Sequence, residues 1–177
     1  ESFIDVKAYI EGYAVRACSK DIDTYAIEAN LENARLLLKN LTMNCNNLTF
    51  NFYNIAAGSQ KERKLMKTSS SKDGYLTSSL IEQHREYNDL ISRIEVEVYP
   101  LDDIIDVERL RQPVLLKVDV EGFEVEVIKG ARKLLRKVDY IMIEASSINR
   151  RPIDKLLFNF KIADNYKSYL LYERITT

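Results

Sequence analysis

The sequence predicts an α/β protein with a mostly parallel central sheet, antiparallel closing strands and a small accessory β-hairpin. Three observations indicate this class: short apolar runs alternate with amphipathic helical patterns, the alternation breaks in the middle of the chain, and two extended runs close it. Alternation of this kind is typical of parallel sheets, because right-handed helical crossovers join neighbouring parallel strands. With 177 residues and no second core pattern, we expect a single domain over residues 1–177. The chain starts at Glu1 without methionine, which leaves open whether upstream elements are lacking.

The sequence pattern of the first third of the chain predicts two strand–helix units followed by a third strand. An apolar strand at residues 3–6 precedes a helical pattern that runs toward Cys18. A second strand at 24–27 is followed by a helix with Asn30 as its N-cap and leucines along one face. A third strand at 48–53 then leads into the turn at 56–58. The first third of the chain is therefore predicted to form a βαβαβ unit, one half of the sheet.

The middle of the chain, residues 59–100, departs from this order. The polar tract 67–74 has turn chemistry and predicts a loop, and the polar stretch 81–90, which carries the only histidine, predicts an exposed helix. Residues 94–99 alternate apolar and acidic side chains, as in a half-exposed strand. We expect this strand to pair with residues 63–67 in an antiparallel hairpin.

The alternation returns at residue 114. A buried strand at 114–118, a helix that buries apolar positions from Phe123 to Leu135, and a strand at 140–144 are expected in turn. A short helix should follow Pro152, and a turn at 164–165 should separate two extended segments that finish the sheet in antiparallel pairing.

Charge and composition exclude several classes of partner. The formal net charge of -1, from 26 basic and 27 acidic residues, provides no general field for nucleic acid, so no nucleic-acid partner is expected. No apolar run approaches the length of a membrane span. Cys18 and Cys45 lack metal-ligand spacing and make a poor disulfide framework for a chain of this size, so reduced thiols and a cytoplasmic location are expected. The oligomeric state is not indicated by the sequence.

The most informative motif follows the strand at 114–118, where residues 117–124 read KVDVEGFE. Carboxylates at Asp119, Glu121 and Glu124 meet at one strand end, and open α/β sheets bind ligands outside the carboxyl ends of their strands. The order resembles the signature of the FkbM family of S-adenosylmethionine-dependent methyltransferases, Lys-hydrophobic-Asp-hydrophobic-Glu-Gly-x-Glu. The resemblance covers nearly the whole chain. It implies a Rossmann-like class I methyltransferase fold, S-adenosylmethionine as cofactor, and a small-molecule acceptor with a hydroxyl group, such as a sugar.

The same resemblance places the methionine end of the cofactor at the loop 7–12, after Asp5. The family pattern Asp-hydrophobic-Gly-x-x-x-Gly has Lys7 and Glu11 here in place of both glycines. A left-handed Lys7 would be strained by about 1 kcal/mol, whereas its ammonium could pair with the cofactor's carboxylate and Glu11 would repel that group. Asp5, which would order the loop, and Lys7 are therefore predicted cofactor-binding residues.

Three further residues are predicted to face the cofactor. Glu28 closes the second strand, where an acidic side chain commonly accepts hydrogen bonds from the ribose hydroxyls, although it could instead be a solvated strand end. Asn54 and Ala56, after the third strand, would lie beside the adenine; an ordinary loop is the alternative.

The acidic turn supplies the predicted catalytic residues, Asp119 and Glu121. Crowded carboxylates raise one another's pKa and could hold a base, or they could collect a divalent cation, and the sequence leaves both mechanisms open. Glu124 has an equally good structural interpretation in the first turn of a helix, and Asp119 could instead cap that helix. Ser79, in a Ser-Ser-Leu element similar to one near the family's site, and Glu144, at the end of the strand 140–144, are predicted to bind the acceptor. A solvated turn is the alternative for Ser79, and a solvated strand end is the alternative for Glu144.

Two hypotheses from different classes follow. The first is an O-methyltransferase acting on a sugar or another small metabolite. The second is a degenerate methyltransferase-like domain that binds a ligand or a protein without transferring a methyl group, for which the glycine-poor loop 7–12 is the evidence. A dinucleotide oxidoreductase is disfavoured, because no Gly-x-Gly-x-x-Gly follows the first strand.

Overall fold

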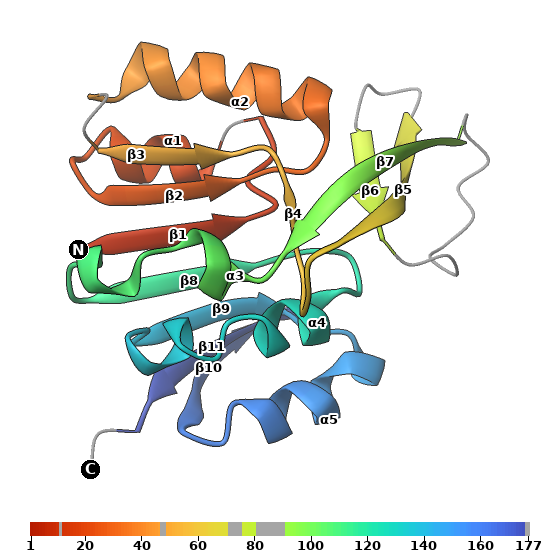
Figure 1. Ribbon diagram of the computed structural model, residues 1–177. Coiled ribbons are helices and arrows are strands. Elements are labelled where there is room, and N and C mark those ends of the chain that lie inside the picture. The colour runs from red at the N-terminus through yellow and green to blue at the C-terminus, as the bar shows by residue number, and fades with distance from the viewer. Residues whose placement is uncertain (11, 47–48, 71–75, 81–90, 176–177) are drawn as a thin grey trace.

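The structure is a computed structural model that describes residues 1–10, 12–46, 49–70, 76–80 and 91–175. A seven-stranded sheet in the order β10-β11-β9-β8-β1-β2-β3 forms its centre (Figure 1). The parallel strands are β1 (Ser2–Val6), β2 (Asp23–Ile27), β3 (Phe50–Tyr53), β8 (Val114–Val118) and β9 (Tyr140–Glu144). Antiparallel strands β10 (Phe160–Tyr166) and β11 (Tyr169–Arg174) close the sheet beside β9. The predicted α/β class with a mostly parallel sheet and antiparallel closing strands is confirmed.

Helices cover both faces of the sheet, because each central strand buries alternate side chains on opposite sides. Ala26 faces α1 (Tyr13–Cys18) and α2 (Leu31–Asn44), whereas Ile4 faces the larger cluster that includes α4 (Glu124–Lys129) and α5 (Ser147–Leu156). Shorter helical turns are α3 (Leu101–Ile104), η1 (Val107–Arg109) and η2 (Leu134–Arg136). Asn30 caps α2 as predicted: its Oδ1 accepts hydrogen bonds from the backbone N–H groups of Glu32 and Asn33 at 2.9 and 3.3 Å.

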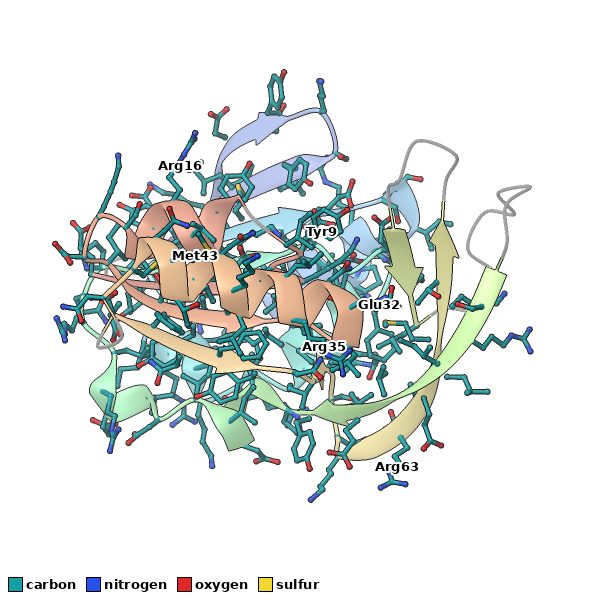
Figure 2. The ribbon with its side chains drawn as sticks, turned by 90° about the horizontal axis from the view of Figure 1, so that it is seen from above. Tyr9, Arg16, Glu32, Arg35, Met43 and Arg63 are labelled. Atoms are coloured by element: carbon teal, nitrogen blue, oxygen red, sulfur yellow. A yellow bond between two sulfur atoms is a disulfide. The ribbon has the colours of Figure 1, made fainter. Side chains whose placement is uncertain are left out.

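The accessory element is a four-stranded sheet and is larger than the predicted hairpin. Its order is β4-β7-β5-β6, with β4 (Ala56–Ala57), β5 (Glu62–Ser70), β6 (Leu76–Ser79) and β7 (Ile91–Tyr99). The expected pairing of residues 63–67 with 94–99 is confirmed, since Arg63 pairs with Glu97. Of the predicted loop 67–74, residues 67–70 are strand, because 67–70 pair with β6 and 67–69 also pair with β7; residues 71–74 lie outside the described residues. In Figure 1 this sheet stands beyond the carboxyl ends of β1 and β2, and Figure 2 shows Arg63 pointing outward from it.

The helix predicted across Phe123 to Leu135 is shorter in the structure. α4 ends at Lys129, and Gly130 lies against the backbone of Gly58 so closely that a Cβ atom there would overlap the Gly58 carbonyl oxygen. After Gly130 the chain forms only the 3₁₀ turn η2. Glycine at the end of α4 permits this close backbone contact, which periodicity does not reveal.

Two boundaries near the C-terminus also differ from the prediction. α5 begins at Ser147, before Pro152, because the Ser146 Oγ accepts a capping hydrogen bond from the Asn149 N–H at 3.3 Å. The predicted turn at residues 164–165 lies inside β10, where a register shift between Ile162 and Asp164 absorbs its irregular geometry. The chain reverses instead after β10, with Lys167 in a left-handed conformation at φ 56°.

The expectation of reduced cysteines is wrong: Cys18 and Cys45 form a disulfide with a Cα–Cα distance of 5.5 Å. Cys18 ends α1 and Cys45 directly follows α2, and both helices pack on the same face of the sheet. The bond thus joins the ends of two neighbouring helices through cysteines that are 27 residues apart in sequence. A single pair of cysteines in a chain of this size did not predict a disulfide, because the packing of the two helices, which brings these residues together, is not visible in the sequence.

Other expectations are settled only in part. The described portion of the chain contains no helix long and apolar enough to cross a bilayer. The helix expected at 81–90, with His84, and the side chain of Glu11 lie outside the described residues.

Removal of the disulfide is expected to lower the free energy of unfolding. Closing a 27-residue separation restricts the unfolded chain by about 3 to 4 kcal/mol. We expect the double variant Cys18→Ser/Cys45→Ser to show a loss of this size in urea denaturation. The oxidised wild type should lose the same amount on addition of a reductant, whereas the double variant should not respond to it; a reductant-insensitive wild type would contradict the pairing.

Candidate functional site

The site lies where the strand order of the central sheet reverses. The chain builds β1, β2 and β3 toward one edge and later adds β8 and β9 on the other side of β1. Ligands of open α/β sheets bind at such a reversal, outside the carboxyl ends of the strands. Val6 pairs with Val118, so the chain leaves β1 at Lys7 and β8 at Asp119 side by side. The two predicted site segments therefore meet at one crevice.

A buried ion pair lies beneath this crevice. Lys117 Nζ is 2.9 Å from Asp5 Oδ1, and the two residues are 5% and 1% exposed. Burial raises the pKa of Asp5, and the ammonium of Lys117 only partly offsets this effect. Neither carboxylate oxygen of Asp5 makes a hydrogen bond of normal geometry with the described residues, so acceptor capacity is left at the base of the site.

The loop after β1 adopts the conformation that its sequence disfavours. Lys7 and Tyr9 are left-handed, with φ of 65° and 60°, which is strained by about 1 kcal/mol or more per residue without glycine. Hydrogen bonds offset this cost: the N–H groups of Lys7 and Ala8 both donate to the Ile27 carbonyl at 2.9 and 3.0 Å. Tyr9 (Figure 2) donates its N–H to Glu28 Oε2 at 3.0 Å. The loop is thus tied to the end of β2.

The Lys7 side chain points into the acidic turn. Its Nζ is 2.8 Å from Glu121 Oε1 and 3.7 Å from Asp119 Oδ1. The Lys7 carbonyl in turn accepts a hydrogen bond from Lys117 Nζ at 3.2 Å. Lys7 therefore contacts the predicted catalytic residues directly, an arrangement that the sequence analysis did not anticipate.

Asp119, Glu121 and Glu144 form an acidic cluster, in which each residue offers a carboxylate oxygen within 4.8 Å of the others. This geometry brings the two predicted catalytic residues together with Glu144, which was expected to bind the acceptor. Ser168, in the turn between β10 and β11, donates its Oγ–H to Glu144 Oε1 at 2.9 Å and holds that side chain in place.

Protons are shared unequally within the acidic cluster. Burial alone would raise the pKa of Asp119, but the ammonium groups of Lys7 and Lys117 hold it below its ordinary value. Burial raises the pKa of Glu144, and the negative charges of Asp119 and Glu121 raise it further. Of Glu144 and Asp119, Glu144 therefore binds a proton more readily, while Asp119 stays ionised.

Glu124 shapes the acidic turn from inside. Its Oε1 accepts hydrogen bonds from the N–H groups of Gly122 and Val120 at 2.9 and 3.3 Å, and its Oε2 accepts one from Asn149 Nδ2 at 2.8 Å. The residue is 2% exposed, so these bonds satisfy it within the protein. Its structural interpretation is the better supported one. Gly122 has φ 101°, the tight turn that its predicted role requires.

Glu28 is placed at the end of β2, as predicted, but is 1% exposed. Its Oε1 accepts the Asn30 N–H at 2.9 Å and its Oε2 accepts the Tyr9 N–H. Burial raises its pKa, and these hydrogen bonds oppose the rise. Each carboxylate oxygen retains a second lone pair, so Glu28 can accept further hydrogen bonds while it holds the loop.

A small cavity of about 40 Å³ lies beside Glu28 and brings four of the predicted residues together. Lys7, Glu28, Ala56 and Ser79 line it with apolar neighbours, namely Val6, Ile27, Ala29, Ile55, Ala57, Met66, Leu80 and Val120. Ser79 Oγ donates to the Glu121 carbonyl at 3.0 Å, which connects the accessory sheet to the acidic turn. Ligand pockets usually measure about 300–1,000 Å³, so a nucleoside-sized ligand requires the lining to move apart.

Asn54 has a different place from the one expected. Its Nδ2 donates to the carbonyls of Glu28 and Ala29 at 2.8 and 3.2 Å, and the residue is exposed outside the cavity lining. In the structure it therefore supports the backbone after β2.

Three residues of the site were missed by the sequence analysis. Tyr169 donates its hydroxyl to Asp119 Oδ2 at 2.8 Å, and burial together with this bond raises the pKa of Tyr169. Asn149 fixes Glu124, and Lys117 pairs with Asp5. Lys117 opens the quoted motif and could have been identified there. Tyr169 is 50 residues from Asp119 in sequence and gave no comparable signal.

The fold and the site define a Rossmann-like α/β protein of the methyltransferase class. Residues 5–163 match the family model described as the Methyltransferase FkbM domain. The chain belongs to this family, and the resemblance seen in the motif at 117–124 is confirmed.

Known proteins similar to this chain agree with that assignment. The hexuronic acid methyltransferase AglP of Haloferax volcanii is 32% identical over 63 residues, which cover 35% of this chain and 26% of that protein. The crystal structure of the methyltransferase FkbM from Methylobacillus flagellatus KT has a TM-score of 0.64 at 20% identity and covers 97% of this chain and 43% of the other. Monomeric WbdD has a TM-score of 0.51 at 9% identity, covering 97% and 36%. The chain thus spans less than half the length of each of these proteins, and the two structural similarities show the fold alone.

The raised pKa of Glu144 predicts a stability trend with pH. Its ordinary value is 4.5 and its folded value is higher, so the folded state holds the proton more tightly. The resulting stabilisation is present below the ordinary value and is lost as the pH rises through the folded value. We expect the free energy of unfolding of Glu144→Gln, relative to wild type, to increase with pH when urea denaturation is compared between about pH 4 and pH 8.

A matched control is Glu108→Gln on η1, where the carboxylate is 76% exposed and remote from the acidic cluster. This variant should follow the wild-type trend. If the difference in free energy of unfolding between Glu144→Gln and wild type does not change with pH, the pKa of Glu144 is not raised in the folded state.

Proposed function

We propose that this chain is an S-adenosylmethionine-dependent O-methyltransferase that modifies a hydroxyl of a sugar or another small metabolite. The observation that carries the proposal is the meeting of Glu28, the loop from Asp5 and the acidic cluster at the carboxyl ends of β2, β1 and β8. Membership of the FkbM family supports methyl transfer. The name of the Haloferax volcanii relative supports a sugar acid as the class of acceptor to try first.

The chemistry of the residues fits the cofactor. Glu28 offers free lone pairs to the ribose hydroxyls, and Ile27, Ile55 and Ala56 form an apolar wall suited to an adenine ring. The carboxylate of Asp5, paired with Lys117, would order the loop at the methionine end, together with Lys7. Asn54 would act on this pocket through the backbone of Glu28, to which it is hydrogen-bonded.

The acidic cluster would serve the acceptor. When bound, S-adenosylmethionine supplies a methyl group on a sulfonium, which is transferred by in-line displacement to the acceptor oxygen. Asp119 and Glu121 would hold the acceptor hydroxyl and draw its proton into the cluster, with Ser79 and Glu144 beside them. The raised proton affinity of Glu144 gives that proton a place to go.

One observation favours the alternative of a degenerate binding domain. The cavity beside Glu28 measures about 40 Å³, and the loop above it has two left-handed residues that are not glycine. A domain that keeps the fold but no longer admits the cofactor would have this appearance. Cofactor binding separates the two functions.

The organisation of the chain and its setting are also proposals. We propose that residues 1–177 act as one methyltransferase-like unit with a small-molecule acceptor and no nucleic-acid partner. The predicted cytoplasmic location stays a prediction, and the Cys18–Cys45 disulfide is an observation against it, because reducing compartments keep most cysteines as thiols.

Replacement of Glu28 is expected to weaken cofactor binding. A ribose hydrogen bond to a charged group contributes about 1.5–3 kcal/mol, so Glu28→Ala should weaken affinity by at least about tenfold. Isothermal titration of S-adenosylmethionine and S-adenosylhomocysteine provides the measurement. Glu28→Gln, which keeps one acceptor oxygen, should lose less.

Glu32→Ala on α2, an exposed acidic residue near Glu28 in sequence, is the matched control and should bind as wild type does. Circular dichroism must show that each variant is folded, since Glu28 also holds Tyr9. Absence of heat with the wild type at about millimolar ligand would favour the binding-domain alternative.

Neutralising the acidic turn is expected to lower turnover more than cofactor affinity. General-base assistance contributes about a hundredfold or more, so Asp119→Asn and Glu121→Gln should each lower kcat by at least that factor with a hexuronic acid as acceptor. The formation of S-adenosylhomocysteine measures kcat, and titration measures cofactor affinity. Glu95→Gln on the accessory sheet, 61% exposed, is the control. Unchanged kcat in both variants would remove the acidic turn from the mechanism.

A further inference from the structure

We propose that Lys7 is a built-in counter-cation of the acidic cluster, and that its ammonium fills the place where Asp119, Glu121 and Glu144 would otherwise bind a divalent cation. Lys7 then acts as a positioning residue that orders the carboxylates without a metal ion. The consequence for turnover rests on the proposed function, whereas the consequence for metal binding does not.

The spacing of the cluster is that of a cation site. Oxygen ligands around Mg²⁺ or Ca²⁺ lie at about 2.0–2.6 Å from the ion, so they are separated from one another by no more than about 5 Å. The three carboxylates meet this limit, with one oxygen each within 4.8 Å of the others. Two of the three already face the ammonium of Lys7, at 2.8 Å from Glu121 and 3.7 Å from Asp119.

The backbone of Lys7 is held so that its ammonium stays in the cluster. The N–H donates to the Ile27 carbonyl at 2.9 Å, and the carbonyl accepts from Lys117 Nζ at 3.2 Å. The backbone of Lys7 has a left-handed φ of 65°, and its side chain is only 19% exposed. Both features restrict the direction in which the Lys7 side chain leaves the backbone. A lysine on a free surface loop would instead lose its ion pair readily to solvent.

The local balance of charge explains why a cation is needed. Lys117 is paired with Asp5 at 2.9 Å, which leaves Lys7 as the ammonium in contact with the acidic cluster among the described ion pairs. Three carboxylates crowded together repel one another strongly at low effective dielectric. Removal of the Lys7 charge therefore strengthens this repulsion, and the cluster should then bind a cation from solution more tightly.

Lysine and a metal ion have different chemical consequences. An ammonium is a single positive charge with three donors, whereas a divalent cation would also polarise an acceptor oxygen and lower its pKa. With Lys7 in place, the acceptor proton has to be taken by a carboxylate. The choice of residue at position 7 therefore selects between the two mechanisms that the sequence left open.

The test is to remove the charge at position 7 and to titrate Mn²⁺ into the full chain. Lys7→Gly suits the left-handed backbone, and Lys7→Met removes the charge without adding flexibility. Electron paramagnetic resonance and calorimetry measure Mn²⁺ affinity, which should rise by about tenfold or more in both variants. Lys7→Arg, which keeps a cation, should bind Mn²⁺ as weakly as wild type.

Two controls assign any gain to the cluster. Lys64→Met removes a surface lysine that lies 3.6 Å from Glu62, and should leave Mn²⁺ affinity at the wild-type level. Adding Glu121→Gln to Lys7→Gly removes one ligand and should abolish the gain. Wild type that binds Mn²⁺ as tightly as Lys7→Gly would overturn the proposal, as would a gain in Lys7→Gly that Lys7→Met does not share.

Turnover provides a separate readout. With S-adenosylmethionine and a hexuronic acid, wild-type turnover should be unaffected by a chelator, and Lys7→Gly should require Mg²⁺ or Mn²⁺. Wild-type turnover that a chelator abolishes would overturn the proposal. Absence of turnover in every variant would instead count against the proposed function, and the Mn²⁺ affinities would still decide the role of Lys7.

Discussion

The buried ion pair between Asp5 and Lys117 is the interaction on which the rest of the site depends. It joins β1 to β8 at the point where the strand order reverses, and the same ammonium holds the carbonyl of Lys7. Leaving one partner of a buried pair uncompensated costs about 3–5 kcal/mol, so the pair specifies how the two strand ends sit against each other. The positions of the loop after β1 and of the acidic turn after β8 both follow from it.

Strain and charge are concentrated at this point. Lys7, Tyr9 and Glu121 are all left-handed without being glycine; Lys7 contacts the acidic cluster, and Glu121 belongs to it. Backbone strain of this kind persists only where surrounding contacts over-determine the conformation, and here the hydrogen bonds to Ile27 and Glu28 provide them. The strained loop carries the one ammonium that reaches Glu121 in the described ion pairs. A departure from the family's glycines thereby becomes part of the electrostatics of the site.

The accessory sheet completes the site from the opposite side. Ser79, on β6, contacts the Glu121 carbonyl, and Met66, on β5, lines the cavity with Leu80. Three separate parts of the chain therefore enclose the place proposed for the cofactor: the strand ends, the acidic turn and the accessory sheet. Because the cavity is small, binding of the cofactor requires these three parts to move relative to one another. Cofactor affinity is therefore the property that separates an active enzyme from a degenerate binding domain.

The sequence by itself determined the parallel strands, the capping of α2, the family and the identity of most acidic residues in the site. Strands at 114–118 and 140–144 and the pairing of residues 63–67 with 94–99 were predicted as observed, because apolar periodicity and turn residues act locally. The tertiary structure alone decided where Lys7 points, that Tyr169 reaches Asp119, that Cys18 and Cys45 meet, and that α4 ends at Gly130. These contacts depend on strand order, register and close backbone approach between distant segments, and such properties leave no periodic trace in the chain.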